Sequence, residues 1–186
     1  DEAAALLAYN KWKLQQAVEP RFVKEEAENA ATPPSGTDSP LVGKPAPDFK
    51  IPLLSGETFK LTEQRGKIVV LDFWATWCGP CMQSMPEVDR VVREFEDRGV
   101  QLIAVNLEEP ATQIKSTLER LKLKVTVARD EDGVVAQRYA ATAIPQTVII
   151  DRQGKITRLF VGGGPKLSQQ LHDAIKELVD SSTGEP

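Results

Sequence analysis

The sequence contains little cysteine, little histidine and no long apolar run, and each shortage excludes a class of protein. Only two cysteines, Cys78 and Cys81, and one histidine, His172, occur among its 186 residues. A structural zinc site needs four ligands, and two cysteines three positions apart cannot form the disulfide framework of a small secreted domain. No apolar run approaches the ~20 residues that a membrane-spanning helix needs. We therefore expect no metal, no cofactor and no membrane span within these residues.

Basic charge is also not concentrated anywhere in the chain. The 23 basic and 27 acidic side chains give a formal net charge of -4, and the basic ones are scattered. Nucleic-acid binding requires a basic face, so we expect no nucleic-acid partner. The composition, with 41% hydrophobic and 27% charged residues, is typical of a soluble globular protein. The length suits one domain with an extension.

The first 40 residues differ in character from the rest. Residues 1–30 are rich in Ala, Glu, Lys and Gln with apolar side chains at helical spacing, although Pro20 indicates a break or kink. Residues 31–40, ATPPSGTDSP, are typical of a linker. We predict a helical extension and linker over 1–40, acting as a spacer or as a docking element, and a folded domain over 41–186.

Strand and helix patterns alternate along the folded part, which indicates an α/β domain. The runs at 68–75 and 100–107 are mostly apolar, as in strands that are covered on both faces. Turn residues between apolar segments predict two hairpins, over 48–61 and 147–161, and a short strand over 125–128. Amphipathic spacing predicts four helices, from Cys81 towards Gly99 and over 110–121, 134–139 and 167–178.

The two cysteines form a Cys-x-x-Cys motif between a buried strand and a helix. Cys78 therefore lies at a helix N-terminus, where unpaired backbone N–H groups and the helix dipole stabilise an anion. We expect Cys78 to be partly thiolate and to attack a disulfide, which gives a mixed disulfide. Cys81 then attacks the sulfur of Cys78, releases the product and leaves an internal Cys78–Cys81 disulfide.

The residues around the motif, FWATWCGPC at 73–81, resemble the active-site segment of thioredoxins. Pro86, at the position where thioredoxins kink this helix, and IPQT at 144–147, similar to their cis-proline loop, extend the resemblance. It implies a thioredoxin-like fold, with a central mixed sheet flanked by helices and preceded here by an N-terminal β-hairpin. It also implies a substrate-binding surface made of Trp77, Gly79, Pro80, Ile144, Pro145 and Gly162. In such a surface Ile144 offers backbone groups to an extended substrate segment.

Two further features resemble the TlpA/ResA-like bacterial proteins. One is the opening VGKPAPDF at 42–49, which that group shares with peroxiredoxins, and the other is an inserted helix and strand between 105 and 139. Two positions depart from that group, because Ser84 stands where many members carry glutamate and Asp72 where many carry asparagine. Asp72 instead matches the thioredoxin aspartate that helps to deprotonate the second cysteine. We expect Asp72 to be buried, to have a raised pKa and to act as the base for Cys81.

These features predict a thiol-disulfide oxidoreductase that reduces a disulfide-containing protein substrate and receives electrons from an upstream thiol donor. The resemblance implies an extracytoplasmic location, in the bacterial periplasm or anchored to face it, with the cytoplasm as the alternative. Because the chain begins with Asp1 rather than Met, we expect any leader or membrane tether to lie outside these residues. We expect a monomer.

Two alternative functions stay open at this point. One is a thiol peroxidase-like antioxidant enzyme, although Ala75 stands where peroxiredoxins carry Thr or Ser, three residues before the reactive cysteine. The other is a binding module in which the thioredoxin fold holds a partner and the cysteines do no chemistry. Turnover of a protein disulfide separates this binding module from a thiol-disulfide oxidoreductase.

Overall fold

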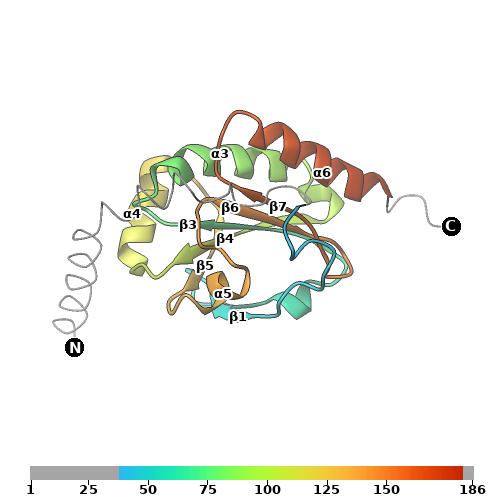
Figure 1. The fold of residues 1–186 in the computed structure, drawn as a ribbon. Coiled ribbons are helices and arrows are strands. Elements are labelled where there is room, and N and C mark those ends of the chain that lie inside the picture. Colours follow the sequence, from blue (N-terminus) through green and yellow to red (C-terminus); the bar gives the residue numbers. More distant parts are fainter. Residues whose placement is uncertain (1–37, 182–186) are drawn as a thin grey trace, which may run out of the picture. The chain divides into compact units, whose positions relative to one another are not determined.

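A five-stranded sheet forms the centre of the computed structural model, which describes residues 38–181 (Figure 1). Its strand order is β5-β4-β3-β6-β7, and a separate two-stranded sheet joins β1 to β2. The strands are β1 (Lys50–Pro52), β2 (Thr58–Lys60), β3 (Ile68–Trp74), β4 (Val100–Leu107), β5 (Thr126–Asp130), β6 (Gln146–Ile150) and β7 (Ile156–Val161). The α-helices are α3 (Gly79–Arg93), α4 (Ala111–Leu121), α5 (Val134–Arg138) and α6 (Leu167–Ser181).

The central sheet is mixed, as the sequence predicts. Strand β3 runs parallel to β4 and antiparallel to β6, while β4 and β5 are parallel and β6 and β7 antiparallel. Both predicted hairpins, β1-β2 and β6-β7, are confirmed. All seven residues of β3 are buried, which explains why the run at 68–75 is apolar except for Asp72, because a central strand with both faces covered has no solvent side.

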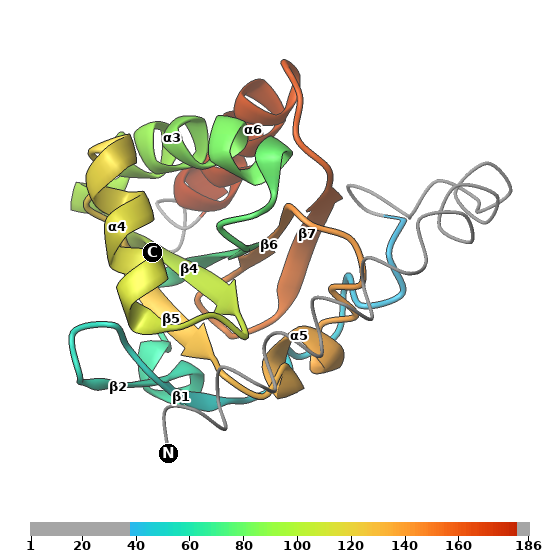
Figure 2. The same cartoon turned by 90° about the vertical axis from the view of Figure 1, so that its left-hand side faces the viewer.

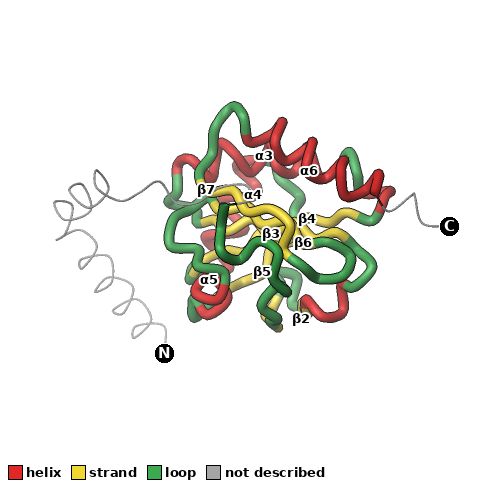
Figure 3. The backbone as a smooth tube through the Cα atoms, turned by 45° about the vertical axis from the view of Figure 1, so that its right-hand side comes forward, coloured by secondary structure: helices red, strands yellow, loops and turns green. Residues whose placement is uncertain are grey.

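Two apolar layers cover the two faces of the sheet. On one face, Ile68 and Val70 pack with residues of α3 and α6, and Ile114 of α4 belongs to a neighbouring cluster that includes Trp74. On the other face, Leu71 and other inward residues pack with the β1-β2 hairpin and α5. Figure 2 shows this layering, with α3, α4 and α6 on one side of the strands and β1, β2 and α5 on the other, and Figure 3 shows α3 and α6 on the side of the strands opposite α5 and β2.

Four strand ends meet at one edge of the sheet. Trp74, the last residue of β3, pairs with Asn106 near the end of the parallel strand β4. Gln146, the first residue of β6, pairs with Phe73 of β3 and with Val161 at the end of β7. The loops that follow β3, β4 and β7 and the loop that precedes β6 therefore lie together, although they are far apart in sequence.

Helix α3, which follows the two-cysteine motif, is shorter than the sequence pattern indicates. Helix α3 ends at Arg93, a 3-10 turn follows at Glu96–Arg98, and Gly99 then takes a left-handed conformation with φ of 79°. Pro86 lies inside α3, where its position matches the predicted kink site. The predicted helical extension over 1–30 and most of the linker lie outside the described residues. Within the described part of the chain, no helix is both long and apolar enough to cross a membrane.

Candidate active site

Cys78 occupies the N-cap of α3. The chain leaves β3 at Trp74, turns through a Cys78 N–H bond to the Ala75 carbonyl of 3.1 Å, and enters the helix at Gly79. The sulfur of Cys78 accepts a hydrogen bond of 3.2 Å from the backbone N–H of Cys81, one of the orphan donors of the first helical turn. Pro80 follows within this turn, where a missing N–H costs nothing. The sequence thus places the sulfur at the positive end of the helix, as predicted.

Cys78 and Cys81 form a disulfide, with their Cα atoms 5.2 Å apart. Cys78 is 5% exposed and Cys81 is fully buried. Only Cys78 can therefore be approached from solvent, and Cys81 can react only with the sulfur of its partner. This difference in access agrees with the predicted order of attack.

The predicted substrate-binding residues gather around the disulfide. Trp77 is 62% exposed, which is exceptional for a large apolar side chain in this domain, and Gly79 and Pro80 are exposed beside it. The bond between Ile144 and Pro145 is cis, and the carbonyl oxygen of Ile144 lies 3.8 Å from the sulfur of Cys78.

The loop after β7 completes this surface. Gly162 has a φ of 88°, a conformation that favours glycine, and its N–H donates a 2.8 Å hydrogen bond to the carbonyl of Pro145. A Cβ at Gly163 would lie 3.5 Å from the Pro80 carbonyl and 3.8 Å from the Pro145 ring, so the absent side chain leaves these groups accessible. The structure brings all six predicted binding residues to the edge where the strand ends meet.

A groove of about 550 Å³ extends from this surface along α3. Its walls come from α3 and from the segment that joins β7 to α6, and they are Pro80, Gln83, Ser84, Glu87, Gly163, Gly164, Pro165, Leu167 and Ser168. Ser84 is buried and donates to the carbonyl of Cys81 over 3.4 Å, so no carboxylate stands at this position.

Asp72 is fully buried in β3, on the sheet face that α3 covers. It shares that face with Trp74, two residues on, and Trp74 packs in the same cluster as Cys81. Its Oδ1 accepts a 2.9 Å hydrogen bond from the hydroxyl of Thr147, its cross-strand partner on β6. Burial raises the pKa of Asp72 to about 7, against the lowering effect of the Thr147 hydroxyl. Among the described residues, Oδ2 of Asp72 has no hydrogen-bond partner.

Sequence reasoning did not find the carboxylate that holds the active-site turn. Glu109, which follows β4 and is 8% exposed, accepts hydrogen bonds from both the backbone N–H and the hydroxyl of Thr76. Asn106 and Gln113 also donate to it. A signal was present, because Asn106 and Glu109 are polar residues at the carboxyl end of a buried strand, where ligand and active-site groups collect in α/β sheets.

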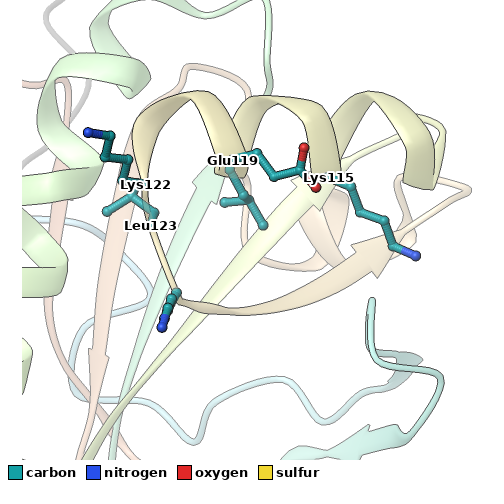
Figure 4. Close-up of a pocket in the computed structure, with 6 residues that line it drawn as sticks. Lys115, Glu119, Lys122 and Leu123 are labelled. Atoms are coloured by element: carbon teal, nitrogen blue, oxygen red, sulfur yellow. The ribbon is translucent and has the colours of Figure 1, made fainter.

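A second hollow, of about 390 Å³, lies at the C-terminal end of α4 (Figure 4). It is lined by Lys115, Leu118, Glu119, Lys122, Leu123 and Lys124. None of the predicted site residues belongs to it. The thiol pair and the α4 hollow are therefore separate features of the surface.

Comparison with known proteins agrees with this geometry. Residues 42–159 match the model of the AhpC/TSA family. The thiol-disulfide oxidoreductase ResA of Geobacillus thermodenitrificans is 36% identical over 131 residues, which are 70% of this chain and 75% of that protein.

Solved structures give the same picture of the fold. A Chlorobium tepidum protein proposed to be the thiol:disulfide interchange protein DsbE superposes with a TM-score of 0.68 and 32% identity, over 80% of this chain and 99% of that one. A secreted Mycobacterium tuberculosis disulfide oxidoreductase homologous to E. coli DsbE gives a TM-score of 0.58 and 26% identity, over 72% and 95% of the two chains. The predicted thioredoxin-like fold is confirmed. The chain therefore belongs to the AhpC/TSA family, as a relative of the ResA proteins.

Proposed function

We propose that this thiol-disulfide oxidoreductase reduces disulfides in protein substrates, with Cys78 as the nucleophile and Cys81 as the resolving thiol. The observation that carries the proposal is the Cys78–Cys81 disulfide at the N-terminus of α3, in which Cys78 is slightly exposed and Cys81 is fully buried. The relatives named above as thiol-disulfide oxidoreductases and interchange proteins support the same chemistry.

The cycle begins with the reduced dithiol. The Cys78 thiolate attacks one sulfur of the substrate disulfide, the substrate S–S bond breaks, and the second substrate sulfur leaves as a thiolate that takes up a proton. Cys81 then loses its proton and attacks the sulfur of Cys78. The mixed disulfide breaks, the second substrate thiol leaves, and the protein holds its internal disulfide. Two electrons have passed to the substrate, and an upstream thiol donor must return them.

Asp72 is the group that we assign to deprotonate Cys81. Both side chains are fully buried, and Asp72 faces the helix that carries Cys81. A pKa near 7 lets the carboxylate take a proton and release it again at neutral pH. Oδ2 can accept the proton from Cys81, because it has no hydrogen-bond partner among the described residues, whereas Oδ1 accepts from the Thr147 hydroxyl.

The surface around the thiol pair suits an extended polypeptide. Trp77 offers an exposed aromatic face, and the Ile144 carbonyl next to the Cys78 sulfur can accept a backbone hydrogen bond as a strand neighbour would. The glycine turn at Gly162 and Gly163 leaves room for a second backbone. A protein segment that carries a disulfide fits this surface better than a peroxide does.

Peroxidase activity has less support at this site. Ala75 is fully buried and brings no hydroxyl to the position three residues before Cys78.

We also propose an extracytoplasmic location, because one structural relative is described as secreted. The tether and the monomeric state remain expectations from the sequence.

The reduction potential of the Cys78–Cys81 pair tests the direction of exchange. We expect a value close to that of thioredoxin, about -270 mV, because the pair encloses the same Gly-Pro dipeptide. The measurement equilibrates the protein with defined dithiothreitol or glutathione ratios and follows tryptophan fluorescence. A value near the about -120 mV of DsbA would make the protein an oxidant instead, and the absence of any reversible transition would favour a binding module.

Replacing each cysteine separately tests the order of attack. Cys81→Ser should accumulate a mixed disulfide with an oxidised protein substrate, one per chain, because the resolving thiol is missing. Cys78→Ser should form none, since Cys81 is fully buried. Mass spectrometry after acid quenching and digestion locates the bond. Trapping through Cys81 in the Cys78→Ser variant would reverse the assignment.

Asp72→Asn should slow resolution of the mixed disulfide by roughly tenfold or more, because a positioned base typically contributes at least that much. In the wild type the resolution rate should rise with pH to a plateau, with a midpoint near 7 set by Asp72. The variant should lose this step. Stopped-flow fluorescence over a pH series measures it. Thr147→Val is the matched variant, because loss of a hydrogen bond that lowers the pKa of Asp72 should move the midpoint upwards.

The same carboxyl links stability to pH, with a definite sign. Its folded pKa of about 7 lies above the ordinary value of 3.8 for an aspartate, so the native state binds more protons than the unfolded state between those values. The free energy of unfolding should therefore fall as pH rises from about 4 to about 7, and Asp72→Asn should remove part of that slope. Denaturant unfolding of wild type and variant at several pH values checks this. Parallel curves, together with an unchanged resolution rate, would remove Asp72 from the mechanism.

A further inference from the structure

Glu109 is a buried carboxylate with four donors directed at its two oxygens. Oε2 accepts from the backbone N–H of Thr76 and from Nδ2 of Asn106, each over 2.7 Å. Oε1 accepts from the hydroxyl of Thr76 and, over 3.0 Å, from Nε2 of Gln113. The Thr76 hydroxyl both donates to Glu109 and accepts from Nε2 of Gln113. The side chain thus joins the turn after β3, the end of β4 and the first turns of α4.

An ionised carboxylate satisfies this arrangement, because its two oxygens only accept hydrogen bonds and together offer about four lone-pair sites. Each oxygen of Glu109 faces two donors, and an amide in its place would direct its NH₂ group at one of these two pairs. A glutamine has nearly the same shape, but its NH₂ group would face either the Thr76 N–H and Asn106 or the Thr76 hydroxyl and Gln113. The network therefore matches a carboxylate better than an amide of the same size.

The backbone around Glu109 is held in place as well. Glu108, just before it, has a φ of 53°, a left-handed conformation that non-glycine residues rarely adopt. The N–H of Glu108 donates to the carbonyl of Asp130 on β5 over 3.0 Å. This turn directs Glu109 back across the sheet edge towards Thr76.

Thr76 is the residue through which Glu109 can act on the site. It lies between the end of β3 and the reactive pair, two residues before Cys78 and directly before the exposed Trp77. Glu109 holds it by both its backbone and its side chain, 33 positions away in sequence. The turn that carries Trp77 and Cys78 is therefore fixed at its first residue by a group from another strand.

We propose that Glu109 is a positioning residue that acts through Thr76 to set the place of Trp77 in the substrate-binding surface. The inference rests on the proposed function, since it concerns how a protein disulfide is held. Glu109 does not contact the sulfurs. Its loss should weaken docking of a protein substrate more than it changes the chemistry of Cys78, whose thiolate depends on the N-terminus of α3.

The test compares Glu109→Gln with wild type in two reactions. With insulin as protein disulfide and dithiothreitol as electron source, the KM for insulin should rise at least fivefold while kcat changes less than twofold. Alkylation of reduced Cys78 by iodoacetamide, which needs no docking, should change less than twofold. In Glu109→Ala, which removes the acceptor altogether, hydrogen exchange at the Thr76 amide, followed by NMR, should accelerate at least tenfold.

Matched variants separate positioning from general stability. Thr76→Val, which removes the hydroxyl and keeps Glu109, should raise KM by a smaller factor, and Thr76→Ser should restore the wild-type value. Asp130→Asn alters another buried carboxylate, which accepts from the backbone N–H groups of Val135 and Ala136, and should leave KM unchanged.

The outcomes distinguish this inference from the proposed function. An unchanged KM in a folded Glu109→Gln protein would overturn the inference, as would equal effects of Glu109→Gln and Asp130→Asn. If Glu109→Gln does not fold, Thr76→Val and Thr76→Ser decide by the same criterion. If wild type itself fails to reduce insulin, the proposed function fails, and unaltered Thr76 exchange in Glu109→Ala would then overturn the positioning role independently.

Discussion

The first turn of α3 is the feature on which the chemistry depends. Its backbone N–H groups have no partners within the helix, and the N–H of Cys81 points at the sulfur of Cys78. An anion at that place is stabilised by this hydrogen bond and by the helix dipole. The nucleophile therefore needs no nearby cation. What the rest of the fold must supply is the position of the turn, access for one sulfur and a base for the other.

The mixed sheet supplies all three from one edge. Strand β3 ends at the turn that leads to Cys78, β4 ends before Glu109, and β6 begins after the cis bond at Pro145. Because these strands are neighbours, loops that are distant in sequence meet around two sulfur atoms. Asp72 lies two residues before the end of β3, on the face covered by α3, where burial raises its pKa into the range that a proton carrier needs. In the proposed mechanism, the exposed residues around Cys78 bind the substrate, and the buried Asp72 transfers a proton.

Sequence reasoning found those parts of the site that are local or that carry a strong pattern. The run at 68–75 predicted a buried strand, and the motif at Cys78 and Cys81 predicted the helix N-terminus, because each is read from a few consecutive residues. The burial of Asp72 followed from its place in that run. The Thr76–Glu109 contact was missed, since it is a hydrogen bond between residues 33 positions apart and depends on which strands are neighbours. The early end of α3 at Arg93 was missed for a related reason, since Phe95 continues the apolar spacing of the helix although it lies beyond the helix end, just before the 3-10 turn.

The most direct test of this account is the fraction of Cys78 that is thiolate at neutral pH. It can be measured by the ultraviolet absorbance of the thiolate in the Cys81→Ser variant, against the fully protonated state in acid. A free cysteine is only a few per cent thiolate at about pH 7. The account predicts a fraction several times higher, because the N-terminus of α3 stabilises the anion. A fraction no higher than that of free cysteine would contradict it.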